Sequence, residues 1–138
     1  MDLFSRKIIA CNLSSKPNAK LVTTTFQKAY TNRNSPQGLI FHSDRGTQYT
    51  AMSFRKLLDS HGVVQSFSKK DYPFDNACCE SFFKYLKKEE RHYRNYHTKK
   101  ELEHSVFQYI EGFYNAKRPH GSLELMSPNE KEKDYWNR

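Results

Sequence analysis

The stretch FHSDRGTQYT, residues 41–50, decides how the chain is expected to fold. An apolar run over residues 39–41 stops abruptly at the polar residues His42, Ser43 and Asp44, and a helix-like pattern begins soon afterwards. Asp44 therefore has two interpretations. It can cap the helix that follows, or it can stand at the carboxyl end of a buried strand and hold a metal ion.

Strand-like and helix-like patterns alternate along the rest of the chain. Apolar residues predict short strands over residues 2–13, 39–43 and 63–67. Helical periodicity predicts helices over residues 18–32, 51–61, 75–93 and from 98 onward. Gly62 is the expected stop of the second helix, and Thr98 with Glu101 forms a predicted capping box. Beyond Gly121 the chain is expected to be irregular and to end in a charged tail. This order predicts one α/β domain with parallel strands.

Composition narrows the class of partner. The chain has 138 residues and a formal net charge of +8, which favours an anionic partner such as nucleic acid. Its three cysteines form no CxxC pair and are typical of a reducing, cytoplasmic compartment. No apolar run approaches the roughly 18 residues of a membrane helix, so no membrane partner is expected. A nucleotide or sugar-phosphate enzyme is disfavoured because the sequence has no glycine-rich phosphate loop.

The predicted third helix carries a carboxylate and a row of cations on one face. Successive helical residues advance by about 100°, so a narrow stripe is expected to contain Asn76, Glu80, Lys84, Lys87 and Arg91. In one interpretation, Glu80 and Lys84 form an i,i+4 pair worth roughly 0.2–0.5 kcal/mol of helix stability. In the other, Glu80 binds a metal beside cations that hold nucleic-acid phosphates, with strong salt dependence and little base specificity.

Asp44 and Glu80 together suggest a chemistry. There are 35 residues between them, and one follows a strand while the other lies on a helix beyond the next strand. Phosphoryl transfer on nucleic acids commonly uses two Mg²⁺ ions, which activate the attacking oxygen and stabilise the leaving oxygen. Each Mg²⁺ needs only one or two carboxylates besides water and phosphate oxygens. The chemistry therefore requires carboxylates close to cations that bind the DNA backbone.

Ordered motifs extend this pattern over nearly the whole chain. They are MDLFSRKI (1–8), HSDRGTQY (42–49), YPFDNACCESFFKYLKKE (72–89), FYNAKRPHGSL (113–123) and MSP (126–128). With these motifs the chain resembles the integrase core of IS3-type insertion-sequence transposases. The resemblance implies an RNase H-like α/β fold with C-terminal helices. It also implies DNA strand cleavage and transfer by an Asp-Asp-Glu triad with Mg²⁺ or Mn²⁺.

The resemblance assigns roles to residues. Asp44 matches the second aspartate of the triad and Glu80 the glutamate, so both are expected to be catalytic and to bind metal. Lys87 matches a basic residue two helical turns beyond the glutamate that binds DNA, and Lys84 and Arg91 are expected to help it. Residues expected to shape the site are His42, Ser43, Arg45, Gly46, Gln48 and Asn76. The implied partners are transposon-end and target DNA, with a second copy or an intact transposase, at the bacterial nucleoid.

One departure from the family pattern concerns the first aspartate. In the family it lies on a strand upstream of the piece that MDLFSRKI resembles. Asp2 is the only acidic residue before Asp44 and does not match that position. We therefore expect residues 1–123 to form a partial catalytic core without its first strand, residues 124–138 to form a tail, and the chain alone to be weak or inactive. The alternative is a non-catalytic DNA-binding remnant that pairs with or inhibits an intact transposase.

Overall fold

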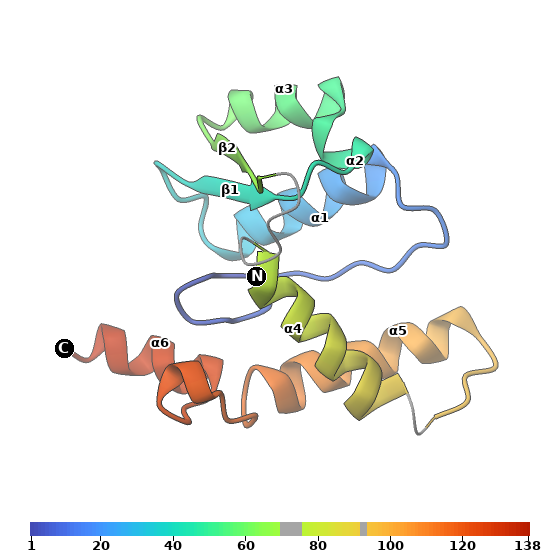
Figure 1. The fold of residues 1–138 in the computed structure, drawn as a ribbon, viewed down its shortest axis with the longest axis vertical. Coiled ribbons are helices and arrows are strands. Elements are labelled where there is room, and N and C mark those ends of the chain that lie inside the picture. Colours follow the sequence, from blue (N-terminus) through green and yellow to red (C-terminus); the bar gives the residue numbers. More distant parts are fainter. Residues whose placement is uncertain (70–75, 92–93) are drawn as a thin grey trace. The chain divides into compact units, whose positions relative to one another are not determined.

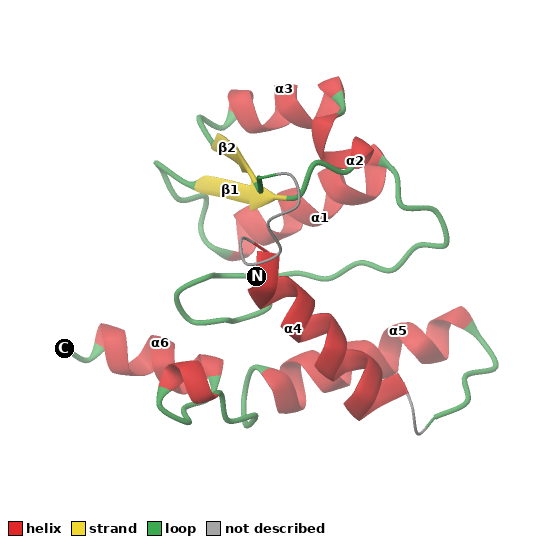
Figure 2. Cartoon of the chain, viewed as in Figure 1, coloured by secondary structure: helices red, strands yellow, loops and turns green. Residues whose placement is uncertain are grey.

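The chain is composed of two compact units, which are described separately. The computed structural model describes residues 1–69, 76–91 and 94–138 (Figure 1). Unit 1 comprises Met1–Ile9 and Cys78–Arg138, and unit 2 comprises Ala10–Ala77. Helices make up most of the regular structure, and within the described ranges the strands belong to unit 2 (Figure 2).

Unit 2 contains a parallel β-α-β arrangement. Its elements are α1 (Ala19–Asn32), β1 (Ile40–Ser43), α2 (Thr47–Thr50), α3 (Met52–Ser60) and β2 (Val64–Phe67). The two strands pair in parallel, with Ile40 opposite Val64 and Ser43 opposite Phe67. Parallel strands need a crossover connection, which α2 and α3 provide. The predicted α/β class and the predicted elements over residues 18–32, 39–43, 51–61 and 63–67 are confirmed, and α2 is an additional helix.

Local signals explain where the helices of unit 2 begin and end. Asn18 caps α1 because its Oδ1 accepts a hydrogen bond from the Leu21 backbone N–H at 3.0 Å. Helix α3 ends before Gly62, whose φ of +65° lies in the left-handed region that glycine adopts at little cost. The next backbone N–H, from Val63, closes on the Leu58 carbonyl at 3.0 Å. The predicted helix stop at Gly62 is confirmed.

An aromatic core holds the sheet of unit 2 against its helices. The buried members are Phe26, Tyr30, Phe54, Leu58 and Val63. Phe54 is fully buried, and its ring lies 5.2 Å from that of Phe41 on β1. Burial of aromatic side chains is the largest apolar contribution available to a small unit. Strand β1, which ends immediately before Asp44, is therefore fixed to the core through Phe41.

Unit 1 is helical. Its elements are α4 (Ala77–Tyr85), the π-helical turn η2 (Leu86–Arg91), α5 (Lys99–Gln108), the π-helical turn η3 (Tyr109–Tyr114), the 3₁₀ turn η4 (Gly121–Leu123) and α6 (Pro128–Trp136). The third predicted helix is confirmed over its described part, although its ends, within residues 70–75 and 92–93, lie outside the described residues. The α-helical form continues only to Tyr85 and then widens to π geometry. Phe82 of α4 packs edge-on against Tyr114, with ring centroids 4.9 Å apart.

The start of α5 tests the capping box that was predicted for Thr98 and Glu101. The Thr98 hydroxyl accepts a hydrogen bond from the Glu101 N–H at 3.1 Å, but the Glu101 carboxylate accepts from the His97 N–H instead of from Thr98. Only half of the predicted box forms there. A complete capping box joins Ser127 and Glu130 at the start of α6. The prediction of an irregular segment beyond Gly121 is therefore wrong over α6.

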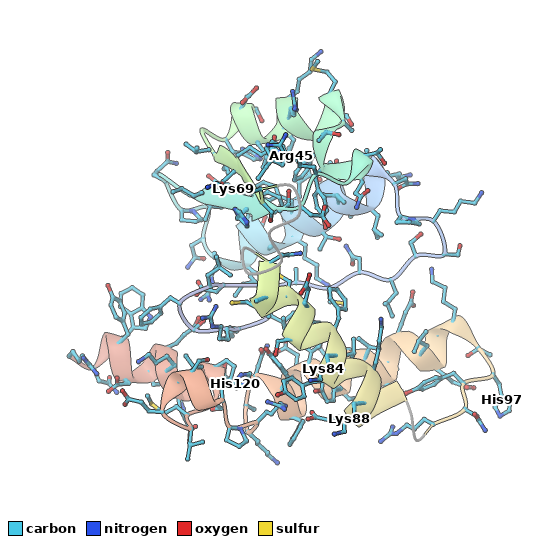
Figure 3. All side chains as sticks on the ribbon, in the orientation of Figure 1. Arg45, Lys69, Lys84, Lys88, His97 and His120 are labelled. Carbon is cyan, nitrogen blue, oxygen red and sulfur yellow. The ribbon has the colours of Figure 1, made fainter. Side chains whose placement is uncertain are left out.

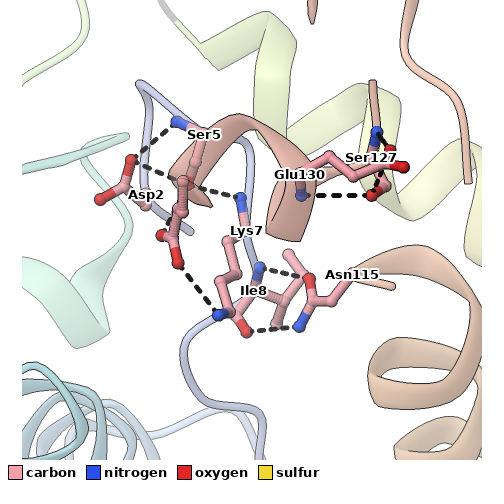
Figure 4. Close-up of polar contacts among 8 residues, drawn as sticks. Asp2, Ser5, Lys7, Ile8, Asn115, Ser127 and Glu130 are labelled. Atoms are coloured by element: carbon pink, nitrogen blue, oxygen red, sulfur yellow. Dashed lines mark hydrogen bonds and ion pairs between the residues drawn. The ribbon is translucent and has the colours of Figure 1, made fainter. Parts of the chain in front are cut away.

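The strand predicted over residues 2–13 does not form, and this prediction is wrong. Asp2 organises a turn instead, because its Oδ1 accepts hydrogen bonds from the Phe4 and Ser5 N–H groups, each at 2.9 Å. The backbone N–H and carbonyl of Ile8 bind the side-chain amide of Asn115, both at 3.0 Å (Figure 4). The extended backbone thus finds its hydrogen-bond partners in a side chain instead of a neighbouring strand.

Candidate functional site

Asp44 lies in an exposed turn immediately after β1. Its Oδ1 accepts a hydrogen bond from the Gly46 backbone N–H at 2.8 Å. The next helix, α2, has Gly46 as its N-terminal cap residue and receives no side-chain capping bond. Asp44 therefore folds its carboxylate back onto its own turn. Of its two interpretations, the helix cap is wrong, and the carboxylate remains exposed at the carboxyl end of a strand.

Gly46 leaves room for this turn. A Cβ on Gly46 would lie 3.0 Å from Asp44 Oδ1 and 2.6 Å from the Gln48 Nε2. Its φ of −55° is open to any residue, so the requirement for glycine comes from space and not from the backbone angle. A larger residue would have to displace the Gln48 amide, the Asp44 carboxylate or both.

Polar side chains clamp the carboxyl ends of the two strands together. The Ser68 N–H donates to the Ser43 carbonyl at 2.9 Å, which extends the ladder by one bond beyond the strands. The ring nitrogens of His42 lie 3.0 Å from Ser66 Oγ and 3.1 Å from Ser68 Oγ. The Arg45 Nε donates to the Ser68 carbonyl at 3.4 Å. The backbone on either side of Asp44 is thus tied to β2.

Ser66 and Ser68 are site residues that the sequence interpretation missed. Only the parallel register, which sets His42 opposite Ser66, shows that they meet the histidine. The available signal was the placement of serines at the end of the second strand, directly across from the residues that precede Asp44. Motif matching alone selects His42 and Arg45 but does not identify the residues that they hydrogen-bond to.

Glu80 lies in unit 1, in the first turn of α4, and its side chain is exposed. A carboxylate is favoured there because the first turn of a helix carries partial positive charge. Within residues 76–91, Glu80 makes no ion pair with Lys84, so the helix-stabilising pair is not formed. The structure keeps both the carboxylate and the ammonium group accessible to other partners.

The cations of the predicted stripe are only partly described. Lys84 and Lys87 are exposed, as is Lys88, and Figure 3 shows Lys84 and Lys88 along α4 and η2. The side chain of Arg91 lies outside the described residues. Since η2 has i→i+5 hydrogen bonding, its residues turn by less than the 100° assumed for a continuous α-helix. Lys87 therefore faces a direction that α-helical spacing alone does not give.

Other basic residues nearby already have acidic partners. Arg94 lies 3.8 Å from Glu90, and Lys99 lies 3.3 Å from Glu103. Glu90 is buried, whereas Lys99 and Glu103 form an exposed i,i+4 pair, and exposed pairs of this kind are typically worth only about 0.3–0.5 kcal/mol. Such weak pairs can exchange their acidic partner for a phosphate. Lys84, Lys87 and Lys88 are exposed and make no ion pair within the described part of the chain.

The donor set is compatible with a hard divalent cation. Asp44 in unit 2 and Glu80 in unit 1 are exposed carboxylates, and oxygen ligands of this kind suit Mg²⁺ and Mn²⁺. The part of the chain that the structure describes holds no cluster of three or more histidine, cysteine, aspartate or glutamate side chains able to bind a metal. Exposed carboxylates of this kind suit an ion that needs only one or two of them besides water and phosphate oxygens.

Family models match the segments of the chain that contain Asp44 and Glu80. One family model, described as the integrase core domain, matches residues 1–73, and a second with the same description matches residues 80–134. The chain belongs to the integrase core family. Asp44 falls within the first matched range, and Glu80, Lys84 and Lys87 fall within the second.

Similar individual proteins include bacterial transposases. The transposase for insertion sequence element IS904 of Lactococcus lactis is 41% identical over 133 residues, which cover 96% of this chain and 53% of that protein. Transposase InsF for insertion sequence IS3A of Escherichia coli is 36% identical over 132 residues, covering 96% of this chain and 46% of that protein. The chain thus spans about half the length of these relatives and is an IS3-type transposase core.

Another Lactococcus lactis relative carries a different name. A protein named ATP-dependent protease is 44% identical over 111 residues, covering 80% of this chain and 36% of that protein. The present sequence has no GxxxxGK[ST] phosphate loop to accompany the ATP dependence in that name. Within the described residues, no helix has the length and apolar character needed to cross a bilayer.

Proposed function

We propose that this chain contributes to the catalytic centre of a transposase that cleaves and joins DNA strands with Mg²⁺ or Mn²⁺. The observation that carries the proposal is the pair Asp44 and Glu80. Each is an exposed carboxylate at the end of a strand or the start of a helix, and each lies within a segment matched by an integrase core model. The RNase H-like form of the core is part of the same proposal.

Asp44 and Glu80 would hold the divalent ions as oxygen ligands. Bound ions of this kind activate the attacking oxygen and stabilise the leaving oxygen of a phosphodiester. The Gly46 N–H holds one oxygen of Asp44 at 2.8 Å, which orients the carboxylate and leaves the second oxygen for a ligand. The clamp of His42 on Ser66 and Ser68 would keep the turn from moving when the ligand binds.

Lys84, Lys87 and Arg91 would bind the phosphates of transposon-end and target DNA. Lys84 and Lys87 are exposed and make no ion pair among the described residues, which supports this role. Contacts of this kind position DNA without reading its sequence and weaken steeply with salt. The expected location is the bacterial cytoplasm at the nucleoid, and assembly with a second copy or an intact transposase would bring in the remaining parts of the active complex.

The second candidate function is a DNA-binding chain without catalysis, which pairs with or inhibits an intact transposase. The geometry of Asp2 favours it. Asp2 is the only acidic residue before Asp44, and its Oδ1 is already bound by the Phe4 N–H, the Ser5 N–H and the Ser5 hydroxyl. Asp2 therefore serves its own turn, and we expect the isolated chain to cleave DNA weakly or not at all.

One set of proteins separates the two functions. The purified chain, Asp44→Asn and Glu80→Gln are compared for nicking and joining of supercoiled DNA, for Mn²⁺ binding by calorimetry, and for DNA binding against salt. Matched controls are Asp59→Asn on α3 and Glu111→Gln on η3, both exposed. Loss of Mn²⁺ binding in the two site variants alone supports the metal centre. Salt-sensitive DNA binding with no nicking under any condition supports the second function, and site variants that bind Mn²⁺ like the controls refute the metal site.

A further inference from the structure

A partly buried ion pair anchors the π-helical turn that carries Lys87 and Lys88. Glu89, the next residue of η2, faces the guanidinium group of Arg118. The Arg118 Nε donates to both carboxylate oxygens, at 3.2 and 3.0 Å, and its Nη2 donates to Oε1 at 2.9 Å. The Tyr109 hydroxyl donates to the second carboxylate oxygen at 2.7 Å. Glu89 is thereby bound from two different segments of unit 1.

The same arginine also contacts the end of the α-helical segment. Its guanidinium carbon lies 3.7 Å from the ring centroid of Tyr85, the last residue of α4. The Arg118 side chain is only 13% exposed, so this cation–π contact is largely shielded from water. Arg118 therefore touches both sides of the junction at which α geometry changes to π geometry. A π turn is a rare local form, and contacts of this kind are what can hold it in place.

Arg118 is not available as a DNA contact. Its Nε and Nη2 donate to Glu89, and its Nη1 donates to the Pro119 carbonyl at 3.3 Å. Burial would raise the pKa of Glu89, but the hydrogen bonds from Arg118 and Tyr109 outweigh it and lower that pKa, so the carboxylate stays ionised at neutral pH. The positive charge of Arg118 is therefore neutralised inside unit 1, whereas Lys87 and Lys88 remain exposed.

We propose that Arg118 and Glu89 are positioning residues that set the direction of Lys87 and Lys88 toward the DNA backbone. This inference rests on the proposed DNA-binding role of the turn. Without the ion pair, η2 keeps the contacts of Glu90 with Tyr96 and Ser105 but loses those of Glu89 with Arg118, and relaxation toward α geometry would rotate both lysines relative to Lys84. A bidentate, stacked arginine cannot be replaced by lysine, which has no planar fork and no stacking face.

The test uses the full chain and a short DNA duplex, with affinity measured between about 50 and 200 mM salt. Lys87→Ala should weaken binding by about threefold to tenfold and reduce the salt slope by about 0.9, as expected for one lost phosphate contact. Arg118→Lys should produce a similar loss although the charge is unchanged. In a Lys87→Ala/Lys88→Ala background, Arg118→Lys should cause no further loss, because lysines that are absent cannot be mispositioned. Glu89→Gln provides a second disruption from the other side of the pair.

Arg138→Lys is the matched control, since Arg138 pairs with Asp134 at an exposed position far along the chain. It should leave affinity and salt slope unchanged. Hydrogen exchange over residues 86–91 gives an independent readout and should become at least about tenfold faster in Arg118→Lys, with circular dichroism unchanged. If Lys87→Ala and Lys88→Ala bind DNA normally, the DNA role and the positioning role both fail. If they bind weakly while Arg118→Lys binds normally, or while Arg118→Lys adds its full loss to that of the Lys87→Ala/Lys88→Ala variant, only the positioning role fails.

Discussion

Replacement of Asn115 by alanine is the perturbation for which unit 1 gives the clearest magnitude. Asn115 is fully buried and its side-chain amide binds both polar groups of Ile8, accepting from the N–H and donating to the carbonyl at 3.0 Å each. Ile8 itself is only 6% exposed. In Asn115→Ala both groups would stay buried and lose their partner, because the rest of the segment offers no strand to replace it.

The expected loss follows from these two orphaned groups. A buried backbone group left without a hydrogen bond costs about 1–3 kcal/mol, so the two groups together predict a loss of about 2–6 kcal/mol. Against a typical total stability of about 5–15 kcal/mol, this is a large fraction. With a urea dependence of about 1.5 kcal/mol per molar, the unfolding midpoint should fall by about 1.3–4 M.

Urea unfolding followed by circular dichroism is the suitable assay. Trp136, the single tryptophan of the chain, is 79% exposed, so its fluorescence would change little on unfolding. Circular dichroism at 222 nm follows both units together. Asn95→Ala, at an exposed position of unit 1, should change stability by less than about 0.5 kcal/mol. A loss below about 1 kcal/mol in Asn115→Ala would refute the reasoning, because Ile8 would then have found other partners.

Three further outcomes are expected. Gly46→Ala should weaken Mn²⁺ binding severalfold in calorimetry, because its Cβ would lie 3.0 Å from Asp44 Oδ1; unchanged binding would mean that the neighbouring Gln48 amide moves aside instead. Gly112→Ala, whose Cβ meets nothing within 4 Å in a helical segment, should stabilise the chain by roughly 0.5–1 kcal/mol in urea unfolding, and a loss would contradict its open surroundings. Burial, aided by the charge of Arg118, lowers the pKa of His120, so the unfolded chain binds that proton first. The stabilisation that neutral His120 gives the folded chain is fully present above the ordinary histidine pKa of about 6.5 and is lost as the pH falls below it. In thermal melts between pH 7 and 5, a His120→Gln variant should not show this loss of stability. If the variant still loses stability, another group is responsible.

Elements whose signals are local were predictable from sequence. The strand β1 and the helices α1 and α3 carry their own apolar periodicity, and Asn18 and Gly62 mark a start and a stop that depend only on neighbouring residues. Helix α6 also carried a local signal, the S-x-x-E box of Ser127 and Glu130, but its charged composition obscured it. The N-terminal segment with its turn at Asp2 is the opposite case. Its composition is typical of a strand, but a strand also needs a partner strand, which composition cannot supply.

The π-helical turns could not be predicted, because their cause is tertiary. The residues of η2 have ordinary helical composition, and its anchors, Arg118 and Tyr109, come from segments about 20 to 30 residues further along the chain. The candidate site shows the same division. Motifs select Asp44 and Glu80, and the Gly46 N–H bond to Asp44 is local. The contacts of His42 with Ser66 and Ser68, by contrast, depend on the strand register.

The segment FYNAKRPHGSL illustrates what the structure adds to a motif. Two of its residues hold parts of unit 1 that are far apart in sequence: Asn115 binds the backbone of Ile8, and Arg118 binds Glu89 beside the exposed lysines. Asn115 is fully buried and the Arg118 side chain is only 13% exposed, and both bind within the unit. In the proposed DNA-binding role, the contribution of Arg118 is therefore geometric. This arginine contributes by fixing where other cations point, and a count of positive charges would assign that contribution to the wrong residue.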